Sequence, residues 1–245
     1  MTAVAGVALV TGAAKRVGRA IALELASAGY DLGIHCHRSL TEAEELRGRI
    51  TSLGRRAVVI QADLALPESW PRLVSSCVAE LGRLDVLVNN ASTFDSLRLD
   101  EFTVNAWERT MRVNLTAAAG LCHYAAPRLA AGGAGCIVNL CDIAADRPFR
   151  KHLAYSCAKA GLVALTRALA VELAPRVRVN GVSPGIAEFP ESYNAATRER
   201  LTAEVPLKRA GTPEDIAKAV RYLAVDAPYV TGQILRVDGG RGVRW

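Results

Sequence analysis

A tyrosine and a lysine stand four residues apart in the segment YSCAK, as Tyr155 and Lys159. Residues at this spacing lie on one face of an α-helix, so a helix here would bring the phenol close to the ammonium group. A nearby ammonium stabilises a phenolate and lowers the pKa of the tyrosine, and the lysine can also donate to hydroxyl groups. The pair therefore predicts proton transfer, although alone it also fits a surface tyrosine beside a solvated lysine.

An aspartate, Asp142, follows an apolar run and precedes Tyr155 by thirteen residues. A carboxylic acid beside the phenol could give a proton to a substrate atom that gains electron density. Asp142 and Tyr155 would then share a proton, with coupled titrations that Lys159 tunes. The alternative is that Asp142 only caps the loop after a strand.

Glycines punctuate the segment VALVTGAAKRVGRA, in which a predicted strand runs directly into a predicted helix. Gly12 and Gly18 let the backbone approach a ligand, and Arg16 stands where dinucleotide-binding turns usually have glycine. Backbone N–H groups and the positive end of a helix can hold a pyrophosphate at such a turn. The segment predicts a dinucleotide site, and the alternative is a tight connection between strand and helix.

His37, Arg38 and Ser39 follow the second predicted strand. Proteins that prefer NAD tend to have an acid here for the ribose 2′-hydroxyl. An acid would repel a 2′-phosphate, whereas an arginine with a hydroxyl and an imidazole would bind it. NADP(H) is therefore favoured, unless these residues form only a solvated loop. His35 and His37 form an H-x-H pair, but no third ligand is evident nearby and no metal site is expected.

Short apolar runs alternate with helical patterns along the chain. Seven runs are predicted as strands, at 6–10, 31–36, 57–61, 85–89, 136–140, 177–183 and 233–237. Helical patterns cover 16–29, 41–54, 68–82, about 107–130, 155–174 and 212–225. Nearly continuous apolar strands separated by helices are typical of a parallel sheet covered on both faces. We expect one Rossmann-type doubly wound α/β domain over residues 1–245, because no linker rich in Pro, Ser or Gly divides the chain.

Several residues predict helix ends. Thr41 with Glu44 has the spacing of a capping box, and Thr212 precedes a proline at a first helical position. Gly29 and Gly54 stand where two helices should stop.

The composition fits one large soluble domain, because 51% of the 245 residues are hydrophobic and 22% are charged. The net charge of +6 is scattered, so an anionic cofactor or substrate is favoured over nucleic acid. The six cysteines form no C-x-x-C pair and lie in apolar segments, as buried free thiols of a reducing compartment do. The apolar N-terminal segment is too short to span a membrane. A cytoplasmic protein with neither membrane nor nucleic-acid partner is expected.

Seven short motifs occur in the order found in one enzyme family. They are TGAAKRVGRAIA, ADL at 62–64, NNAS at 89–92, VNL at 113–115, YSCAK at 155–159, VNGVSPG at 179–185 and DGG at 238–240. With them the chain resembles the short-chain dehydrogenase/reductase family over essentially its whole length. The resemblance implies a nicotinamide cofactor and a homotetramer.

Four departures from the commoner family pattern resemble the pteridine reductase branch, which includes trypanosomatid pteridine reductases and bacterial dihydromonapterin reductases. Arg16 replaces a glycine, HRS follows the second strand, and NNASTF replaces the commoner N-N-A-G. The strongest departure is Asp142, which stands where most of the family has serine.

The resemblance implies roles for the residues at matching positions. The catalytic residues would be Asn114, Asp142, Tyr155 and Lys159. The cofactor contacts would be Thr11, Gly12, Arg16, Val17, Gly18, His37, Arg38, Ser39, Asp63, Leu64, Asn89, Ala91, Ser92, Tyr155, Lys159, Pro184 and Gly185. The substrate contacts would be Arg16, Ser92, Phe94, Asp142 and Tyr155, with Phe94 stacked on a pterin ring. A substrate loop is expected at about 185–210, and its sequence follows no pattern that can be carried over.

Reduction of a C=N bond makes the ring nitrogen electron-rich, so an acid aimed at that nitrogen is more useful than a serine hydroxyl. We therefore expect NADPH-dependent reduction of a dihydropterin to a tetrahydropterin, with oxidised pterins and dihydrofolate as further candidates. One alternative is a short-chain reductase of carbonyls, such as a 3-oxoacyl-carrier-protein reductase. Another is a non-catalytic NADP-binding regulator, since a fold does not by itself imply turnover.

Overall fold

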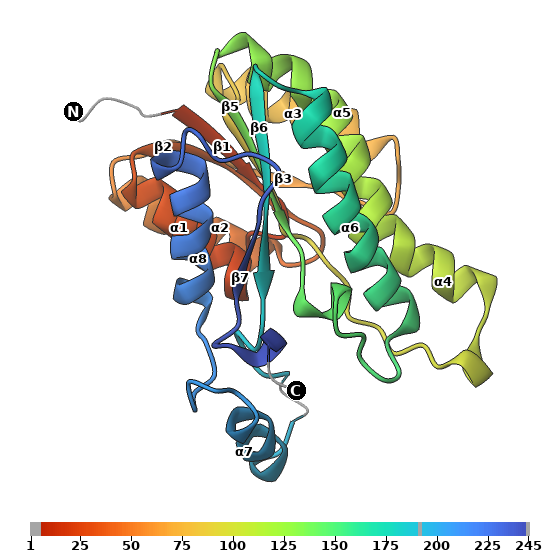
Figure 1. The fold of residues 1–245 in the computed structure, drawn as a ribbon. Coiled ribbons are helices and arrows are strands. Elements are labelled where there is room, and N and C mark those ends of the chain that lie inside the picture. The colour runs from red at the N-terminus through yellow and green to blue at the C-terminus, as the bar shows by residue number, and fades with distance from the viewer. Residues whose placement is uncertain (1–5, 191–192, 244–245) are drawn as a thin grey trace.

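A computed structural model describes residues 6–190 and 193–243. Within them, parallel strands form one sheet in the order β3-β2-β1-β4-β5-β6-β7 (Figure 1). The strands are β1 (Gly6–Val10), β2 (Tyr30–Cys36), β3 (Ala57–Gln61), β4 (Val86–Asn89), β5 (Gly135–Leu140), β6 (Val177–Pro184) and β7 (Ile234–Val237). The chain winds outward in one direction from β1 to β3 and in the other from β4 to β7. The predicted doubly wound α/β fold is confirmed, with a topological switch point between β1 and β4.

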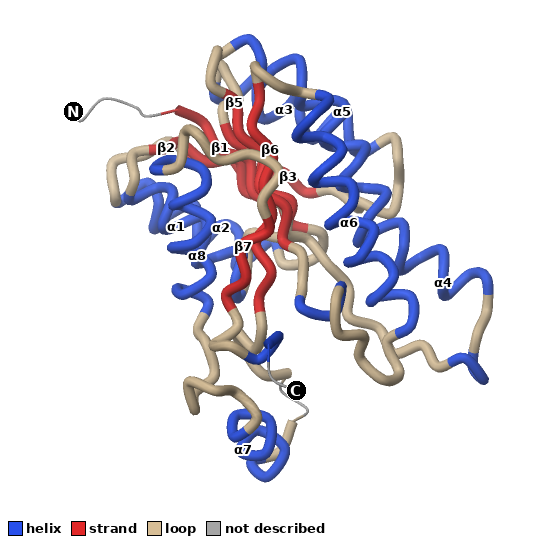
Figure 2. Tube along the Cα trace, viewed as in Figure 1, coloured by secondary structure: helices blue, strands red, loops and turns tan. Residues whose placement is uncertain are grey.

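Helices cover both faces of this sheet (Figure 2). The helices α1 (Arg16–Ser27), α2 (Leu40–Ser52) and α8 (Pro213–Arg221) lie on one face. The helices α3 (Ser69–Leu81), α5 (Ala117–Ala131) and α6 (Leu153–Glu172) lie on the other, and α4 (Val104–Met111) contacts α6.

The two faces have separate hydrophobic cores, and most strands contribute to both, whereas the apolar side chains of β2 all pack under α1, α2 and α8. Ala8 and Val10 of β1 pack into the core under α1, α2 and α8, whereas Val7 and Leu9 pack under α3 and α5. Successive side chains of a strand point to opposite faces, so a strand buried on both sides has to be apolar throughout. This explains why the strands were visible in the sequence, each to within one residue at either end.

One predicted helix is interrupted. The expected helix at about 107–130 is α4, then a π-helical turn at Arg112–Thr116, then α5. A second π-helical turn, Tyr222–Asp226, follows α8. Such turns insert an extra residue into the helical hydrogen-bond ladder, and no apolar periodicity announces them.

A further helix, α7 (Ala195–Ala203), forms inside the expected substrate loop. It projects from the end of the sheet where the last described residues also lie (Figure 1). Its residues are mostly exposed or half-buried and none is fully buried, which is why its sequence shows no apolar face. Short 3₁₀ turns occur at Leu99–Glu101, Ile143–Ala145 and Arg241–Val243.

The prediction for the start of α8 is confirmed, and that for α2 is wrong. Thr212 accepts from the N–H of Asp215 and forms a capping box with it. The helix α2 instead begins at Leu40, so Thr41 lies inside it, and Glu44 pairs with Arg47 at 2.6 Å. Glu44 thus takes part in an i,i+3 ion pair on the exposed helix face and not in a capping box.

The predicted glycine stops are confirmed. Gly29 and Gly54 directly follow the capping residues of α1 and α2 with φ of 97° and 77°. Glycine adopts this left-handed conformation without a steric cost, which allows the chain to leave the helix.

All six cysteines are free thiols, as expected, and five of them are buried. Cys157 is the exception, because α6 turns it outward. Within 6–190 and 193–243, no helix combines the length and the apolar character that crossing a membrane would require.

Candidate active site

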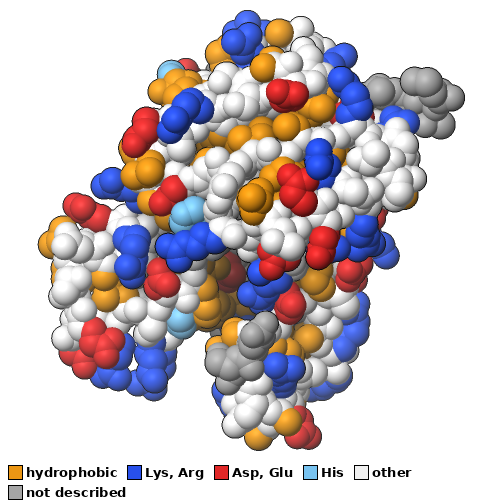
Figure 3. Space-filling model, turned by 180° about the vertical axis from the view of Figure 1, so that it is seen from behind, with side chains coloured by type: hydrophobic (Ala, Val, Ile, Leu, Met, Phe, Trp, Pro, Cys, Tyr) orange, Lys and Arg blue, Asp and Glu red, His pale blue; other side chains and the backbone are white. Residues whose placement is uncertain are grey.

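A pocket of about 940 Å³ opens beyond the carboxyl ends of the central strands. Its lining includes Gly12 after β1, Asn90 after β4, Cys141 after β5 and Gly185 after β6. Seen from behind, the molecule is hollowed beside the projecting end, and hydrophobic side chains are visible inside (Figure 3). The volume is near the upper end of the roughly 300–1,000 Å³ of small-molecule sites, and open α/β sheets bind their ligands at this switch point.

Most of the predicted site residues line this pocket. They are Gly12, Arg16, Val17, Gly18, His37, Asp63, Leu64, Ala91, Ser92, Phe94, Asp142, Tyr155, Lys159, Pro184 and Gly185. The lining leaves out Thr11, Arg38, Ser39, Asn89 and Asn114.

Thr11, Asn89 and Asn114 are buried behind the lining. Asn89 is buried in the core, where its amide donates to Asn139 Oδ1 at 2.9 Å. The next residue, Asn90, lines the pocket and donates to the carbonyl oxygens of Thr11 and Gly12 at 2.8 and 3.1 Å. Asn90, which is not among the predicted site residues, therefore holds the glycine turn.

Arg38 and Ser39 lie beside the main pocket. Arg38 lines an adjoining hollow together with His37 and Asp63, whose side chains are 3.6 Å apart. Ser39 precedes α2 as its capping residue.

The turn between β1 and α1 has the shape of an anion cradle. Gly12 has a φ of +61°, and a Cβ on Gly18 would lie 2.1 Å from Gly12 O, so neither position admits a side chain. Arg16 has a φ of 53°, a left-handed conformation that explains why glycine is usual there. Among the described residues, the side chain of Lys15, which directly precedes α1, makes no capping hydrogen bond. The first turn of α1 has no acidic residue. Backbone geometry and helix polarity thus fit the phosphates of a dinucleotide.

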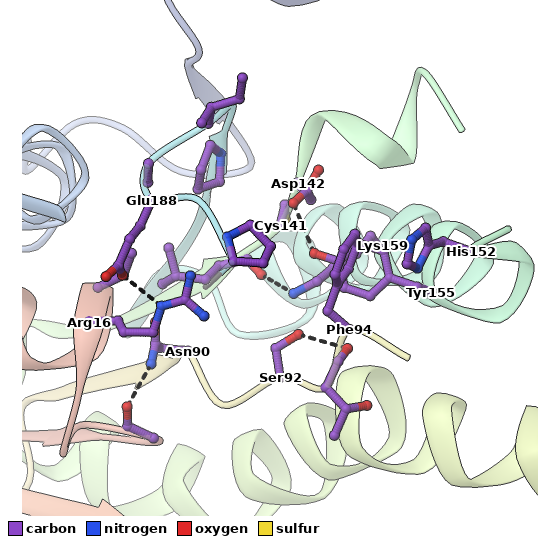
Figure 4. A pocket seen from close by; sticks show the side chains of 18 of the residues that line it. Arg16, Asn90, Ser92, Phe94, Cys141, Asp142, His152, Tyr155, Lys159 and Glu188 are labelled. Carbon is purple, nitrogen blue, oxygen red and sulfur yellow. Dashed lines mark hydrogen bonds and ion pairs between the residues drawn. The ribbon is translucent and has the colours of Figure 1, made fainter. Parts of the chain in front are cut away.

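The guanidinium of Arg16 reaches across the pocket to Glu188, with 2.6 Å between Nε and Oε2 (Figure 4). Glu188 belongs to the predicted substrate loop. This contact joins the cofactor turn to that loop, although residues 191–192 of the loop lie outside the described part.

His35 also lines the pocket, and its ring is fully engaged. Its Nδ1 lies 3.0 Å from the N–H of Gly12, and its Nε2 lies 3.1 Å from Ala62 O. Burial lowers the pKa of His35 to about 4. Neither nitrogen is available to a metal, and no cluster of three metal-binding side chains occurs among the described residues.

Asp142, Tyr155 and Lys159 meet at the end of β5 (Figure 4). The Tyr155 hydroxyl donates to Asp142 Oδ2 at 2.8 Å, and Asp142 Oδ1 accepts from the N–H of Ala144 at 2.7 Å. Lys159 Nζ donates to Leu140 O at 2.7 Å. Asp142 therefore combines the two alternatives left open by the sequence, because it caps the following turn and also binds the tyrosine.

The electrostatics differ from the sequence prediction in one respect. Burial, with Asp142 as the next cause, raises the pKa of Tyr155 well above its usual value, so the expectation of a lowered pKa is wrong. Burial also raises the pKa of Asp142 and lowers that of Lys159. The ammonium stabilises Asp142, but it is bound to Leu140 and does not offset the burial of the phenol. The phenol keeps its proton and directs it toward Asp142.

Asn114 lies in the π-helical turn between α4 and α5. Its amide donates to the carbonyl oxygens of Thr93 and Thr110 at 3.1 and 3.0 Å, and its oxygen accepts from the Ser92 hydroxyl and from the N–H of Thr93. It is buried and does not line the pocket. Asn114 thus anchors the segment that carries Ser92 and Phe94 into the site.

An aromatic cluster forms the wall near Tyr155. The ring of Phe94 stacks on His152 with 3.9 Å between centroids and 13° between planes. It also meets Tyr155 edge to face at 4.9 Å and Phe149 at 6.4 Å. Sequence reasoning missed His152 and Phe149, although both lie in the segment PFRKHLAY directly before the predicted helix.

Charged residues from α7 and from the C-terminal turn close the substrate side. Glu204 is 2.8 Å from Arg200 and 3.7 Å from Arg241, and all three line the pocket. The guanidinium of Arg241 also lies over Phe149, 5.8 Å from its centroid.

Known proteins are similar to this chain over nearly its whole length. A family model described as enoyl-(acyl carrier protein) reductase matches residues 12–241. A 3-oxoacyl-[acyl-carrier-protein] reductase of Synechocystis sp. is 37% identical over 98% of both chains, and one of Staphylococcus aureus is 34% identical over 95% of this chain and 96% of its own. A Streptomyces violaceoruber protein, whose name assigns it to the granaticin polyketide synthase as a ketoacyl reductase, is 37% identical over 96% of both chains.

None of these relatives is named a pteridine reductase, so their names agree with the carbonyl alternative and not with the predicted pterin branch. The family match covers nearly the whole chain, and the glycine cradle fits a nicotinamide dinucleotide. The chain belongs to the short-chain dehydrogenase/reductase family of oxidoreductases.

Proposed function

We propose that this protein is an NADPH-dependent reductase that converts a dihydropterin to a tetrahydropterin at a C=N bond. The observation that carries the proposal is the 2.8 Å hydrogen bond from Tyr155 to Asp142 inside the pocket. Burial raises the pKa of this carboxyl group, so a proton is easier to hold there than on an ordinary aspartate.

The residues divide the work of the reaction. The bound nicotinamide supplies a hydride. The ring nitrogen of the C=N bond takes up one proton from Asp142. Tyr155 then passes its hydroxyl proton to Oδ2 of the carboxylate, and a proton from solvent restores the phenol. The Lys159 ammonium favours the carboxylate that Asp142 becomes at the moment it gives its proton. Proton transfer by a placed side chain contributes about 10²–10⁴-fold to such reactions.

The shape of the wall favours a flat aromatic substrate. Of the four phenylalanines in the chain, Phe94, Phe149 and Phe189 line this pocket. The side chain of Phe94 is 44% exposed there, so its ring is open to a ligand. Stacking on aromatic rings suits a planar pterin better than a flexible acyl chain.

The preference for NADPH rests on the hollow that Arg38 shares with His37 and Asp63. An arginine–phosphate contact is worth roughly 1.5–3 kcal/mol, or about 10–100-fold in kcat/KM. Wild type should therefore use NADPH at least about tenfold more efficiently than NADH, and Arg38→Asp should abolish the difference. Steady-state kinetics with both cofactors measures this, and equal efficiency in wild type would contradict it.

A second candidate is reduction of a 3-oxoacyl thioester, and the names of the relatives favour it over the pterin reaction. In that reaction Tyr155 would protonate a carbonyl oxygen. Asp142 argues against it, because most of the family has at this position a serine, whose hydroxyl can donate to a carbonyl oxygen.

A substrate panel separates the candidates. With NADPH, wild type should turn over dihydropterins, and Asp142→Ser should lower kcat on them at least about 100-fold while the Kd of NADPH stays within twofold. Turnover of a 3-oxoacyl thioester but no pterin would establish the second candidate. NADPH binding without consumption on either substrate would indicate a regulator.

The homotetramer, the cytoplasmic location and the role of residues 185–210 as the substrate loop stay predictions from the sequence. The loop prediction is supported by Phe189, Arg200 and Glu204, which line the pocket.

A further inference from the structure

We infer that His35 is a positioning residue for the nicotinamide cofactor, which holds the glycine turn in its binding conformation through the N–H of Gly12. The inference rests on the family's nicotinamide cofactor and is independent of whether the substrate is a pterin. It gives a role to His35, the member of the H-x-H pair that does not line the hollow beside Arg38; His37 does line that hollow.

The side chain of His35 is enclosed between two segments of the cofactor half. It is 2% exposed. Nδ1 is 3.0 Å from the N–H of Gly12, and Nε2 is 3.1 Å from Ala62 O, in the residue before Asp63. The carbonyl oxygen of His35 also accepts from the N–H of Ala13 at 2.9 Å.

These partners fix the form of the ring. A backbone N–H can only donate, so Nδ1 must be unprotonated and accept. Nε2 therefore carries the proton and donates to Ala62. Protonation of Nδ1 would replace the bond to Gly12 with two opposed N–H groups, and burial lowers the pKa of the ring to about 4.

The hydrogen bond from Gly12 to His35 completes the fixing of the turn, because the other groups around Gly12 are already held. The carbonyl of Gly12 is held by Asn90 at 3.1 Å, and Gly18 packs so closely that a Cβ would lie 2.1 Å from the same oxygen. The N–H of Gly12 itself donates to His35 Nδ1. A turn fixed on both sides before the ligand arrives loses less conformational entropy when it binds phosphate, which increases affinity.

If His35 acted only through packing, a different result would be expected. Two substitutions, each of which keeps one of the two hydrogen-bonding positions of the ring, distinguish a packing role from a positioning role. Asparagine places an acceptor oxygen at the position of Nδ1, so His35→Asn keeps the Gly12 bond and loses the Ala62 bond. Glutamine places an amide at the position of Nε2, so His35→Gln keeps the Ala62 bond and loses the Gly12 bond. Each variant loses one buried hydrogen bond, so a packing role predicts similar effects of both.

The Kd of NADPH, measured by the change in its fluorescence without any substrate, is the readout. Urea unfolding of the same variants reports stability separately. His35→Asn should bind NADPH within about threefold of wild type, and His35→Gln should bind about tenfold or more weakly, because the Gly12 N–H is left unpaired. Equal Kd values for the two variants, at any level, would overturn the inference.

Discussion

Asp142 occupies a position where a charged carboxylate is costly, and its contacts explain how it is kept there. It accepts from Tyr155 and from the N–H of Ala144, and the Lys159 ammonium and Arg241 favour its charged form. Burial nevertheless dominates and raises its pKa. A residue that is destabilising at neutral pH and yet aimed into a pocket is typical of a functional acid.

The stack of His152 on Phe94 gives a residue-scale prediction. His152→Ala should raise KM for dihydropterin about 2–10-fold with little change in kcat, because an aromatic pair is worth roughly 0.5–1.5 kcal/mol. His152→Phe keeps a ring against Phe94, so its KM for dihydropterin should be close to that of wild type. Steady-state kinetics checks this, with the Kd of NADPH as the control; an unchanged KM in His152→Ala would show that the stack does not orient the substrate.

At the scale of elements, the site depends on how strand ends and helix starts meet. The turn between β1 and α1 is held by Asn90 after β4 and by His35 of β2, so three strands fix one loop. The π-helical turn before α5 places Asn114 against Thr93 and so anchors the segment after β4. Each element contributes through its end, where backbone groups are free to bond outside the sheet or helix.

Two glycines test this dependence. Gly18→Ala in α1 would place a Cβ 2.1 Å from Gly12 O, so it should lower stability by about 1–3 kcal/mol and weaken NADPH binding. Gly48→Ala in α2 meets no atom within 4 Å and should raise stability by about 0.5–1 kcal/mol. Urea unfolding of both variants, with a fluorescence titration of NADPH, measures the contrast. Retained stability and NADPH affinity in Gly18→Ala would mean that the turn can move aside.

For the whole molecule, buried ionisable groups link stability to pH. In the unfolded chain His35 binds a proton below about pH 6.5, whereas burial lowers its pKa in the native state to about 4. Its contribution to stability is therefore complete above pH 6.5 and is lost as the pH falls toward 4. The raised pKa of Asp142 acts in the opposite direction, because protonation in acid relieves the cost of burying its charge.

The resulting prediction concerns the free energy of unfolding. His35 should contribute a loss of roughly 2 kcal/mol between pH 7 and pH 5. His35→Asn has no titrating ring, so its stability should fall by about 2 kcal/mol less than that of wild type over the same interval. Urea titrations at the two pH values measure this. Parallel losses in both proteins would assign the acid sensitivity to other groups.

The sequence by itself determined the sheet, because most strands are apolar along their whole length and the helices between them are periodic. It also determined the cofactor turn and the residues around Tyr155, since these depend on glycines and on fixed spacings within one element. It did not reveal the stack of His152 on Phe94, the engagement of the His35 ring or the hydrogen bonds from Asn90 to the glycine turn. Those contacts join residues from different elements, and only the tertiary structure decides which side chains face one another.

The direction in which the Tyr155 pKa shifts is likewise decided by the tertiary structure. Spacing along a helix predicted that Lys159 would lower it, but burial and the neighbouring Asp142 raise it. Burial depends on every element that closes the pocket, from the segment after β4 to the start of α6. Local spacing decides which groups can meet, and the fold decides how far water is excluded from them.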